Sequence, residues 1–486
     1  MNYRFMIYLL GTVMLILSAL MLLPMLVSVI YSESVLPFLF TVLILLALAL
    51  PAVLFSKPRG KKIYAKEGFV LVALSWTLMS LISALPFVFS GTIPNYIDAL
   101  FETVSGYTTT GASVLQGAEI DLAPRGIMFF RSFTHWIGGM GVLVFMLAIL
   151  PSDGSGAIHI MRAEVPGPTK GKLVPRLRQT ALILYGIYIS ITVIETVALM
   201  LCGLPLYDAV VTSFATTGTG GFSVLSSSVG GYANPAAEWV IAIFMLISGV
   251  NFNLYYFILI RSFTPIFKNE ELKVYLSICL LATALITVNL TLSCAEAFPS
   301  VGDAIRGAFF QVTSIMSTTG FVTYDITLLP KLTQTLMLVL MFFGACAGST
   351  AGGFKISRLI IVFKMMRSNL RRMLKPNSVK ALKLNGEPMS EEVGEASLGY
   401  LALYSATMLL TLLLVSFDGF DLTTSITATV SCFNNVGPAL GEAAASFAPF
   451  SPFAKLVLTL AMLFGRLELY PMLILLSPTT WRRSMN

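Results

Sequence analysis

The sequence predicts an all-α membrane protein with about ten transmembrane helices. Three observations carry this prediction. The composition is strongly apolar, ten apolar runs are long enough to cross a bilayer, and four connections between these runs share one pattern that ends in glycine. We therefore expect a two-helix N-terminal preface followed by four units, each made of a helix, a re-entrant loop and a second helix.

The composition excludes a water-soluble protein of this length. Hydrophobic residues make up 56% of the 486 residues and charged residues only 11%, whereas soluble domains carry about 25% charged residues. No stretch of ordinary polarity is long enough to form a soluble catalytic domain, so we expect a protein that is not an enzyme and has no catalytic residues. The five scattered cysteines are interpreted as packing residues without a disulfide framework.

A helix that spans a bilayer needs about 20 mostly apolar residues. Such runs lie near residues 5–30, 36–55, 68–90, 126–150, 180–203, 237–260, 274–298, 333–362, 397–417 and 454–477. The first run is too long for a signal peptide and is not followed by a small-residue cleavage site, so we expect it to remain in the protein.

Positive charge orients these spans, because Lys and Arg are concentrated in cytoplasmic loops. Most of the 31 Lys and Arg lie near the chain ends or in segments 56–67, 151–178, 261–273 and 363–396. We therefore expect a multi-pass protein of the cytoplasmic (inner) membrane, surrounded by lipid, with both termini in the cytoplasm. Topology then explains the net charge of +7, and no nucleic acid partner is expected.

The four connections on the opposite side each begin with Asp, continue as a short semi-apolar stretch and end in small residues. The first reads D-A-L-F-E-T-V-S-G-Y-T-T-T-G-A-S (98–113), and the second, D-A-V-V-T-S-F-A-T-T-G-T-G-G-F-S (208–223), aligns with it without gaps. The aligned aspartates are Asp98, Asp208, Asp303 and Asp421, and the aligned glycines are Gly111, Gly221, Gly320 and Gly437. This pattern divides the chain into a preface (1–66) and repeats at 67–178, 179–273, 274–396 and 397–486.

The repeated pattern has a physical interpretation. The residues after each Asp suffice for about three helical turns, and we expect the four aspartates to be the N-caps of these helices. The helix C-terminus then points its negative end toward the middle of the membrane. Extended backbone at that depth must be covered by protein or line a water-filled cavity. Four such strands around a pseudo-fourfold axis make rings of carbonyl oxygens that can replace the hydration shell of an ion. The alternative interpretation is four polar extracellular loops.

Seven stretches carry a resemblance to a known family. S-G-Y-T-T-T-G-A-S (105–113), T-T-G-T-G-G-F-S (216–223), S-T-T-G-F (317–321) and F-N-N-V-G-P (433–438) resemble the pore loops of the Trk/Ktr/HKT potassium transporters. W-I-G-G-M-G-V (136–142), A-G-S-T-A-G-G-F-K (347–355) and M-L-F-G-R-L-E (462–468) are similar to the TrkH-like membrane subunits of that superfamily. The resemblance covers essentially the whole chain.

The resemblance implies four pore-lining repeats in one chain, assembly as a homodimer, and a K⁺ filter formed by loop backbone. The implied filter residues are Thr109, Thr110, Gly111, Thr219, Gly220, Gly221, Thr318, Thr319, Gly320, Asn435, Val436 and Gly437. Glycine at position 111 implies selectivity for K⁺ over Na⁺. The second strand reads T-G-G and not T-T-G, which departs from the family pattern but leaves ligation by backbone oxygens possible.

The eighth apolar run is interrupted by G-A-C-A-G-S-T-A-G-G-F-K (344–355). Glycine at this density is a poor helix former. A phosphate-binding loop is disfavoured because Lys355 follows Phe354 where that motif needs Gly before its Lys. A close-packed helix contact and a flexible loop lining the pore both remain open, and the resemblance implies a gating loop. The expected gate residues are Gly344, Gly348, Ser349, Thr350, Gly352, Gly353 and Arg466.

Arg466 lies midway along the last span, where an arginine is costly unless it faces a cavity or a partner. We expect it to face the ion path beside the 344–353 loop; structural pairing with a carboxylate or with carbonyls is the alternative. His135 is interpreted as a packing residue. A carrier coupled to H⁺ or Na⁺ would need buried acids, for which Glu195 and Glu102 are the candidates. No dinucleotide fingerprint occurs, so we expect this chain to bind no nucleotide; the resemblance implies a separate cytosolic, nucleotide-binding TrkA-like partner.

Overall fold

The computed structural model describes residues 2–56, 64–141, 177–294, 296–375 and 382–481. Within these ranges the chain is helical, apart from two sheets of two short strands each. Most of the basic segments 56–67 and 151–178, residues 142–150 of the expected span 126–150, and Arg482 and Arg483 lie outside the described residues.

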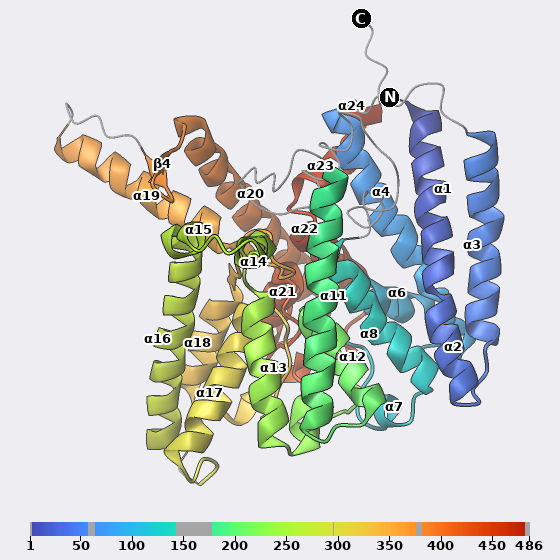
Figure 1. Cartoon of the computed structure of the whole chain (residues 1–486), viewed down its shortest axis with the longest axis horizontal. Helices are drawn as coiled ribbons and strands as arrows, with labels where there is room; N and C mark the ends of the chain where they lie inside the picture. The colour runs from blue at the N-terminus through green and yellow to red at the C-terminus, as the bar shows by residue number, and fades with distance from the viewer. Residues whose placement is uncertain (1, 57–63, 142–176, 295, 376–381, 482–486) are drawn as a thin grey trace, which may run out of the picture.

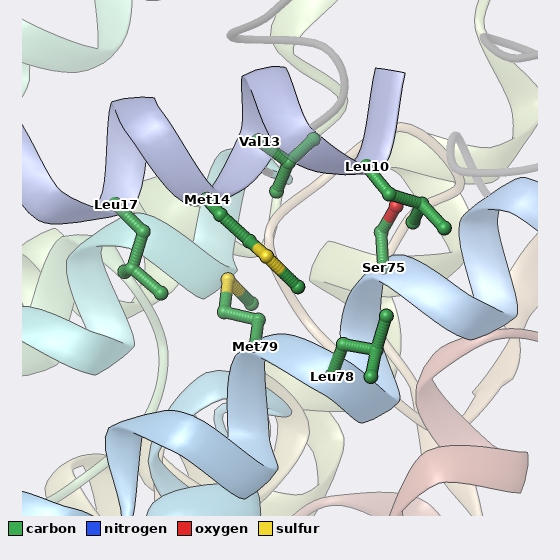
Figure 2. A pocket seen from close by; sticks show the side chains of 7 residues that line it. All are labelled: Leu10, Val13, Met14, Leu17, Ser75, Leu78 and Met79. Carbon is green, nitrogen blue, oxygen red and sulfur yellow. The ribbon is translucent and has the colours of Figure 1, made fainter. Parts of the chain in front are cut away.

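The N-terminal preface packs along the first helix of the repeats. It consists of α1 (Tyr3–Leu20), α2 (Leu22–Ile30) and α3 (Leu36–Phe55), and α1 contacts both α3 and α4 (Ala65–Ser83). Figure 2 shows this contact at a small, mostly apolar cavity between α1 and α4. The cavity is lined by Leu10, Val13, Met14, Leu17, Ser75, Leu78 and Met79. Apolar packing thus joins the preface to the first repeat.

Each repeat contains a long first helix, a short helix followed by a loop, and a second helix. The first repeat comprises α4, α5 (Leu85–Phe89), α6 (Tyr96–Tyr107), α7 (Ala118–Asp121) and α8 (Arg125–Met140). The second comprises α11 (Leu177–Leu201), α12 (Leu206–Thr217), η1 (Ser228–Tyr232), α13 (Pro235–Ser248) and α14 (Phe252–Leu259), with α15 (Thr264–Lys268) leading onward.

The third repeat comprises α16 (Glu270–Ser293), α17 (Val301–Met316), η2 (Ile326–Leu328), α18 (Lys331–Met341), β1 (Phe343–Gly344), β2 (Phe354–Lys355) and α19 (Ile356–Leu374). A hairpin of β3 (Lys383–Leu384) and β4 (Glu387–Pro388) connects it to the fourth repeat. That repeat comprises α20 (Glu391–Val415), η3 (Ser416–Asp418), α21 (Leu422–Asn434), η4 (Gly441–Ala443), α22 (Pro452–Arg466), α23 (Tyr470–Leu476) and α24 (Pro478–Trp481).

The four short helices pack in a closed cyclic order. Each contacts the two long helices of its own repeat and the second helix of the preceding repeat. The contacts to the preceding repeat are α12 with α8, α17 with α13, α21 with α18, and α6 with α22. In Figure 1, α12 and α21 lie between the preface at one edge and α16 at the other. The repeats therefore surround a common centre, as the sequence predicts.

The described helices are roughly consistent with the expected ten spans. Six described helical segments are long and apolar enough to cross a membrane, and the bent pair α13 and α14 raises this to seven. The three remaining runs correspond to α8, to α18 and α19, and to α22 and α23, which are second helices of repeats. The described helices of these three runs are interrupted or shorter than 18 residues, so they do not pass as continuous spans by length and hydropathy.

Glycine and polar residues explain these interruptions. The axes of α13 and α14 differ by 95°, and the break between them contains Gly249 and Asn251. In the fourth repeat the break follows Gly465 and Arg466, and Glu468 and Leu469 both have positive φ. Glycine disfavours a helix. A hydropathy profile does not detect either break, because the residues on both sides of it are apolar.

The two ends of the described chain lie on the same face of the molecule. The first turns of α1, α4 and α11 and all of α24 lie at the upper end of Figure 1, whereas α7 lies at the lower end. Lys66 donates to the carbonyl of Thr479 at 3.2 Å. The two ends of the described chain and Lys66, from the expected basic segment 56–67, therefore adjoin one face.

Candidate functional site

The glycines of the four loops meet in a ring at the centre of the molecule. A Cβ at Gly111 would lie 2.1 Å from the carbonyl oxygen of Gly220, and one at Gly221 would lie 2.0 Å from that of Thr319. A Cβ at Gly320 would lie 2.1 Å from the oxygen of Val436, and one at Gly437 would lie 2.5 Å from that of Thr110. We call residues 109–111, 219–221, 318–320 and 435–437 the glycine segments. Each one touches the next, and the fourth touches the first.

The glycine segments share an unusual backbone. Their first residues are left-handed, with φ of 56° at Thr109, 57° at Thr219, 56° at Thr318 and 56° at Asn435. The middle residue has negative φ and the glycine has positive φ, between 79° and 101°. Non-glycine residues rarely adopt positive φ, and glycine adopts it without steric cost. Alternating handedness turns successive carbonyls toward the same side, which is the arrangement expected for a ring of oxygen ligands.

One backbone hydrogen bond anchors each segment to its own short helix. The middle residue donates to the carbonyl five residues earlier in every repeat. The four bonds are Thr110 to Ser105 (2.9 Å), Gly220 to Ala215 (2.8 Å), Thr319 to Ser314 (2.9 Å) and Val436 to Ser431 (3.0 Å). The structure thus brings all twelve residues of the expected filter together in one fourfold arrangement.

The two departures from the T-T-G pattern each have a structural reason. A Cβ at Gly220 would lie 2.1 Å from Cγ of His135, so that ring occupies the space of a threonine side chain. Asn435 replaces a threonine in the fourth segment, and its Nδ2 donates to Thr110 Oγ1 at 2.9 Å and to the carbonyl of Met462 at 3.0 Å. Asn435 therefore links the fourth segment to the first.

The expected aspartate N-caps are wrong for three of the four helices. Asp421 caps α21 and accepts from the backbone N–H of Thr424 at 3.1 Å. In the other short helices the N-cap residue lies three positions before the aspartate. Their N-caps are Asn95 for α6, Pro205 for α12 and Ser300 for α17. Asp98, Asp208 and Asp303 lie in the first turn, where a carboxylate still complements the helix dipole.

The carboxylates of Asp303 and Asp421 are held in the charged form. A hydrogen bond from Ser300 lowers the pKa of Asp303, and bonds with Thr424 lower that of Asp421. Asp98 accepts instead from Lys455 Nζ at 2.7 Å. Negative charge therefore lies at the helix ends opposite the glycine segments.

Residues 344–355, which we call the central loop, lie against the glycine segments. Parallel pairing of Phe343 with Phe354 and of Gly344 with Lys355 closes the base of the loop. The N–H of Gly352 donates to Thr318 Oγ1 at 2.8 Å, and a Cβ at Gly352 would lie 2.7 Å from that of Asn435. The interrupted helix is thus a loop, and it touches two of the four segments.

The central loop also contacts the break in the second repeat. Cys346 N–H donates to the carbonyl of Gly249 at 3.0 Å, and Phe252 N–H donates to that of Gly348 at 3.0 Å. Thr350 Oγ1 donates to the carbonyl of Ser248 at 3.3 Å. Ser349 Oγ turns inward to the carbonyl of Cys346 at 2.6 Å. Gly348 and Gly353 have φ of 74° and 69°, so the loop needs glycine at both positions.

Arg466 joins the central loop to the first glycine segment. Its Nη1 donates to the carbonyl of Thr350 at 2.6 Å and to Thr109 Oγ1 at 3.2 Å. Its Nη2 donates to the carbonyls of Gly138, at 2.5 Å, and Gly139, at 2.9 Å. Arg466 thus lies beside the loop, as expected. The pairing with carbonyls that was the structural alternative is present as well.

His135 and Glu102 have complete sets of partners. His135 Nδ1 pairs with the carbonyl of Gly106 at 2.7 Å, and Phe222 N–H donates to its Nε2 at 3.2 Å, in agreement with a packing role. Glu102 Oε1 accepts from Arg131 Nε at 2.6 Å, and Oε2 accepts from Val114 N–H at 2.8 Å. No sequence pattern pairs Glu102 with Arg131, since they are 29 residues apart on different helices.

The described residues contain no group of three His, Cys, Asp or Glu side chains that could hold a metal ion. Glu195 is fully buried and accepts from Thr217 Oγ1 at 3.0 Å through Oε2. The oxygen-rich part of the structure is therefore the ring of backbone carbonyls, with the central loop and Arg466 beside it.

Comparison with known proteins agrees with this architecture. The family TrkH, described as a cation transport protein, matches residues 37–482. The Trk system potassium uptake protein TrkH of Salmonella typhimurium is 38% identical over 488 residues, which cover 99% of this chain and 100% of that protein. TrkG of Escherichia coli K12, also named a Trk system potassium uptake protein, is 34% identical and covers 95% of each chain.

A solved structure shows the same fold. The crystal structure of the potassium transporter TrkH from Vibrio parahaemolyticus superimposes with a TM-score of 0.89 at 33% identity, covering 99% of this chain and 100% of that chain. With a family match over residues 37–482 and relatives similar along their whole length, this chain belongs to the TrkH family of cation transport proteins.

Proposed function

We propose that this protein mediates potassium uptake across the cytoplasmic membrane through a channel-like pore at the centre of the four repeats. The single observation that carries the proposal is the closed ring in which each glycine abuts a carbonyl oxygen of the next segment. The relatives named as potassium uptake proteins identify K⁺ as the transported substrate. This is transport and not enzymatic turnover.

Backbone oxygens of the glycine segments coordinate K⁺ in this proposal. The twelve residues concerned are Thr109, Thr110, Gly111, Thr219, Gly220, Gly221, Thr318, Thr319, Gly320, Asn435, Val436 and Gly437. The matching backbone angles and matching anchor bonds support it, because four equivalent strands can present equidistant oxygens to one ion. Fixed oxygens replace the hydration shell without reorganisation.

The central loop and Arg466 act as the gate in this proposal. The loop touches Thr318 and Asn435, and Arg466 donates to both the loop and Thr109. A loop in this position obstructs the path below the ring and must move for conduction. Its glycines, Gly344, Gly348, Gly352 and Gly353, permit that movement.

The assembly is a homodimer that a cytosolic, nucleotide-binding TrkA-like subunit regulates, and this chain itself binds no nucleotide. The relatives are named as parts of a Trk system, which supports a protein that works with other subunits. Both ends of the described chain and the basic helix α19 lie toward the upper face in Figure 1, which supports cytoplasmic termini on that face.

A carrier that couples K⁺ to H⁺ or Na⁺ is the second candidate. Glu195 favours it, because this acid is fully buried and its Oε1 has no hydrogen-bond partner in the described part of the chain. A buried acid that can gain and lose a proton is what a symporter requires. Glu102 no longer supports this candidate, since Arg131 neutralises it.

Ion flux in proteoliposomes distinguishes the two. Rb⁺ uptake is measured with the K⁺ gradient, voltage, pH gradient and Na⁺ gradient imposed separately. A channel follows only the electrochemical gradient of the permeant ion. Uptake driven against that gradient by a pH or Na⁺ gradient would establish the carrier, and loss of this drive in Glu195→Gln would assign it to Glu195.

A further inference from the structure

We propose that Glu271, in the first turn of α16, is the latch that holds the central loop closed, and that the β3–β4 hairpin positions this latch. Glu271 is a positioning residue, because it acts through the loop and touches none of the glycine segments in the contacts described. The inference rests on the proposed function of the loop as a gate.

One oxygen of Glu271 binds the chain on both sides of the residues that touch the glycine segments. Oε1 accepts from the N–H of Ala347 at 2.7 Å and from the N–H of Ser357 at 2.9 Å. Ala347 precedes the residues that touch the glycine segments, and Ser357 follows them at the start of α19. Glu271 is only 6% exposed. A buried carboxylate that accepts two backbone bonds fixes both groups strongly, so the loop cannot leave the ring unless at least one bond breaks.

Lys355 reinforces the same closed arrangement from inside the loop. Its Nζ donates to the carbonyl of Gly352 at 3.2 Å and also to that of Ala351. The side chain is 2% exposed. The turn that touches Thr318 is thus tied to the base of the loop by Lys355, and the base is tied to α16 by Glu271. Releasing Glu271 therefore removes the tie between the loop and α16, and the bonds of the loop to Gly249, Ser248 and Arg466 remain to be broken.

The β3–β4 hairpin reaches the residue next to the latch. Asn385 Oδ1 accepts from the N–H of Glu270 at 2.8 Å, and Glu270 pairs with Lys364 of α19. Lys364 Nζ also donates to the carbonyl of Lys383 at 2.7 Å. The hairpin residues Gly386, Glu387 and Pro388 are exposed. A force on the hairpin is therefore carried to the first turn of α16, where Glu271 lies, without passing through the ring.

If Glu271 is a latch, its substitution should raise basal uptake, whereas substitution of a residue needed only for folding should lower it. Glu271→Ala removes the oxygen that accepts both bonds, so the closed loop loses stability while the glycine segments keep their contacts. We expect basal Rb⁺ uptake by the purified protein, without a partner, to rise about tenfold, which corresponds to about 1.4 kcal/mol in the gating equilibrium. Glu271→Gln keeps an acceptor oxygen and should raise uptake less. The K⁺/Na⁺ permeability ratio should not change in either variant.

Glu238→Gln is the matched control. Glu238 is another buried acid, 7% exposed, that accepts from Arg306 Nε at 2.8 Å and makes no described contact with the loop. We expect wild-type uptake from this variant. Asn385→Gly keeps a residue suited to positive φ at the hairpin turn, where φ is 55°, but removes the acceptor for Glu270. We expect it to raise basal uptake two- to threefold.

A second readout follows the loop directly. Cys346 is 1% exposed and lies next to Ala347. With the other four cysteines replaced by Ser, the rate of Cys346 modification by a membrane-impermeant thiosulfonate should rise in Glu271→Ala together with uptake. Unchanged modification and unchanged or reduced uptake in folded Glu271→Ala would overturn the latch. Unchanged uptake in Asn385→Gly would overturn the role of the hairpin.

Deletion of residues 346–351 separates this inference from the proposed function. If the deletion raises Rb⁺ uptake and Glu271→Ala does not, the loop is a gate and Glu271 is not its latch. If folded protein with the deletion shows no rise, the gate itself fails, and the latch fails with it.

Discussion

The ring of His135 fills the space that a side chain at position 220 would need: a Cβ at Gly220 would lie 2.1 Å from Cγ of His135. The same histidine pairs with the carbonyl of Gly106 in the first repeat and accepts from Phe222 N–H in the second. The buried side chain of His135 therefore contacts the pore loops of two neighbouring repeats. Position 220 must be glycine because the histidine ring leaves no room for a larger side chain.

Gly220→Ala should disturb the second glycine segment. The added methyl overpacks a buried site, at a cost of about 1–3 kcal/mol, so we expect lower thermal stability in detergent and lower K⁺ flux. His135→Ala in the same chain should recover part of the lost flux, because it makes room for the methyl. A double variant no better than Gly220→Ala alone would show that the two residues do not compete for space.

Gly111→Ser should reduce selectivity for K⁺ over Na⁺. Its Cβ would lie 2.1 Å from the carbonyl oxygen of Gly220, so an oxygen of the ring must move. Gly91→Ser is the control for backbone strain alone, since Gly91 has φ of 74° and nothing lies within 4 Å of its Cβ position. The K⁺/Na⁺ permeability ratio of each variant is measured in flux assays. Unchanged selectivity in well-expressed Gly111→Ser and Gly320→Ser would contradict ligation by this ring.

Neutralising Arg466 should increase basal K⁺ flux. The repulsion between an arginine and a K⁺ about 6 Å away is roughly 3 kcal/mol at an effective dielectric constant near 20, which is about a hundredfold in ion occupancy. Arg466→Gln and Arg466→Ala should raise flux, and Arg466→Lys should retain most of the barrier. Arg466 also donates to the carbonyls of Thr350, Gly138 and Gly139, and the alternative is that its role is to hold these groups in place. If neutral variants lose flux and Lys behaves as wild type, Arg466 is a structural tether.

Arg131→Met should destabilise the protein by about 3–5 kcal/mol, because it leaves the buried carboxylate of Glu102 without its cation. The double variant Arg131→Met, Glu102→Gln should recover part of this loss. Arg372→Met is the control: its partner Glu391 is 61% exposed, and exposed pairs contribute about 0–1 kcal/mol. Thermal unfolding in detergent measures all three. Equal effects of Arg131→Met and Arg372→Met would contradict a buried, structural pair.

The central ring could be predicted from the sequence because each of its four segments belongs to a short sequence pattern that occurs four times in the chain. Gly111 and its three counterparts stand at equivalent points after an Asp and a short helix, so alignment within one chain placed them without any distance information. The same alignment misplaced three N-caps. It matched Asp98 with Asp421, but the N-cap of α6 is Asn95, whose side-chain oxygen accepts from the N–H of Ile97.

The individual hydrogen bonds between distant parts of the chain were beyond the sequence, although it placed Arg466 beside the 344–353 loop. Arg466 bonds to Thr350, 116 residues away, and Glu271 bonds to Ser357, 86 residues away. Neither pair shares a helix face or a motif, and only the folded arrangement brings them together. Hydropathy also failed to register the bend at Gly249, because the residues on both sides are as apolar as those of a continuous span.

The location of the permeant ion tests the central claim most directly. Crystals grown in Rb⁺ or Tl⁺ are examined for anomalous scattering, which reveals these ions independently of protein density. We expect peaks on the axis of the ring, within coordinating distance of backbone oxygens from residues 109–111, 219–221, 318–320 and 435–437. A peak beside Glu195 with none inside the ring would contradict the account.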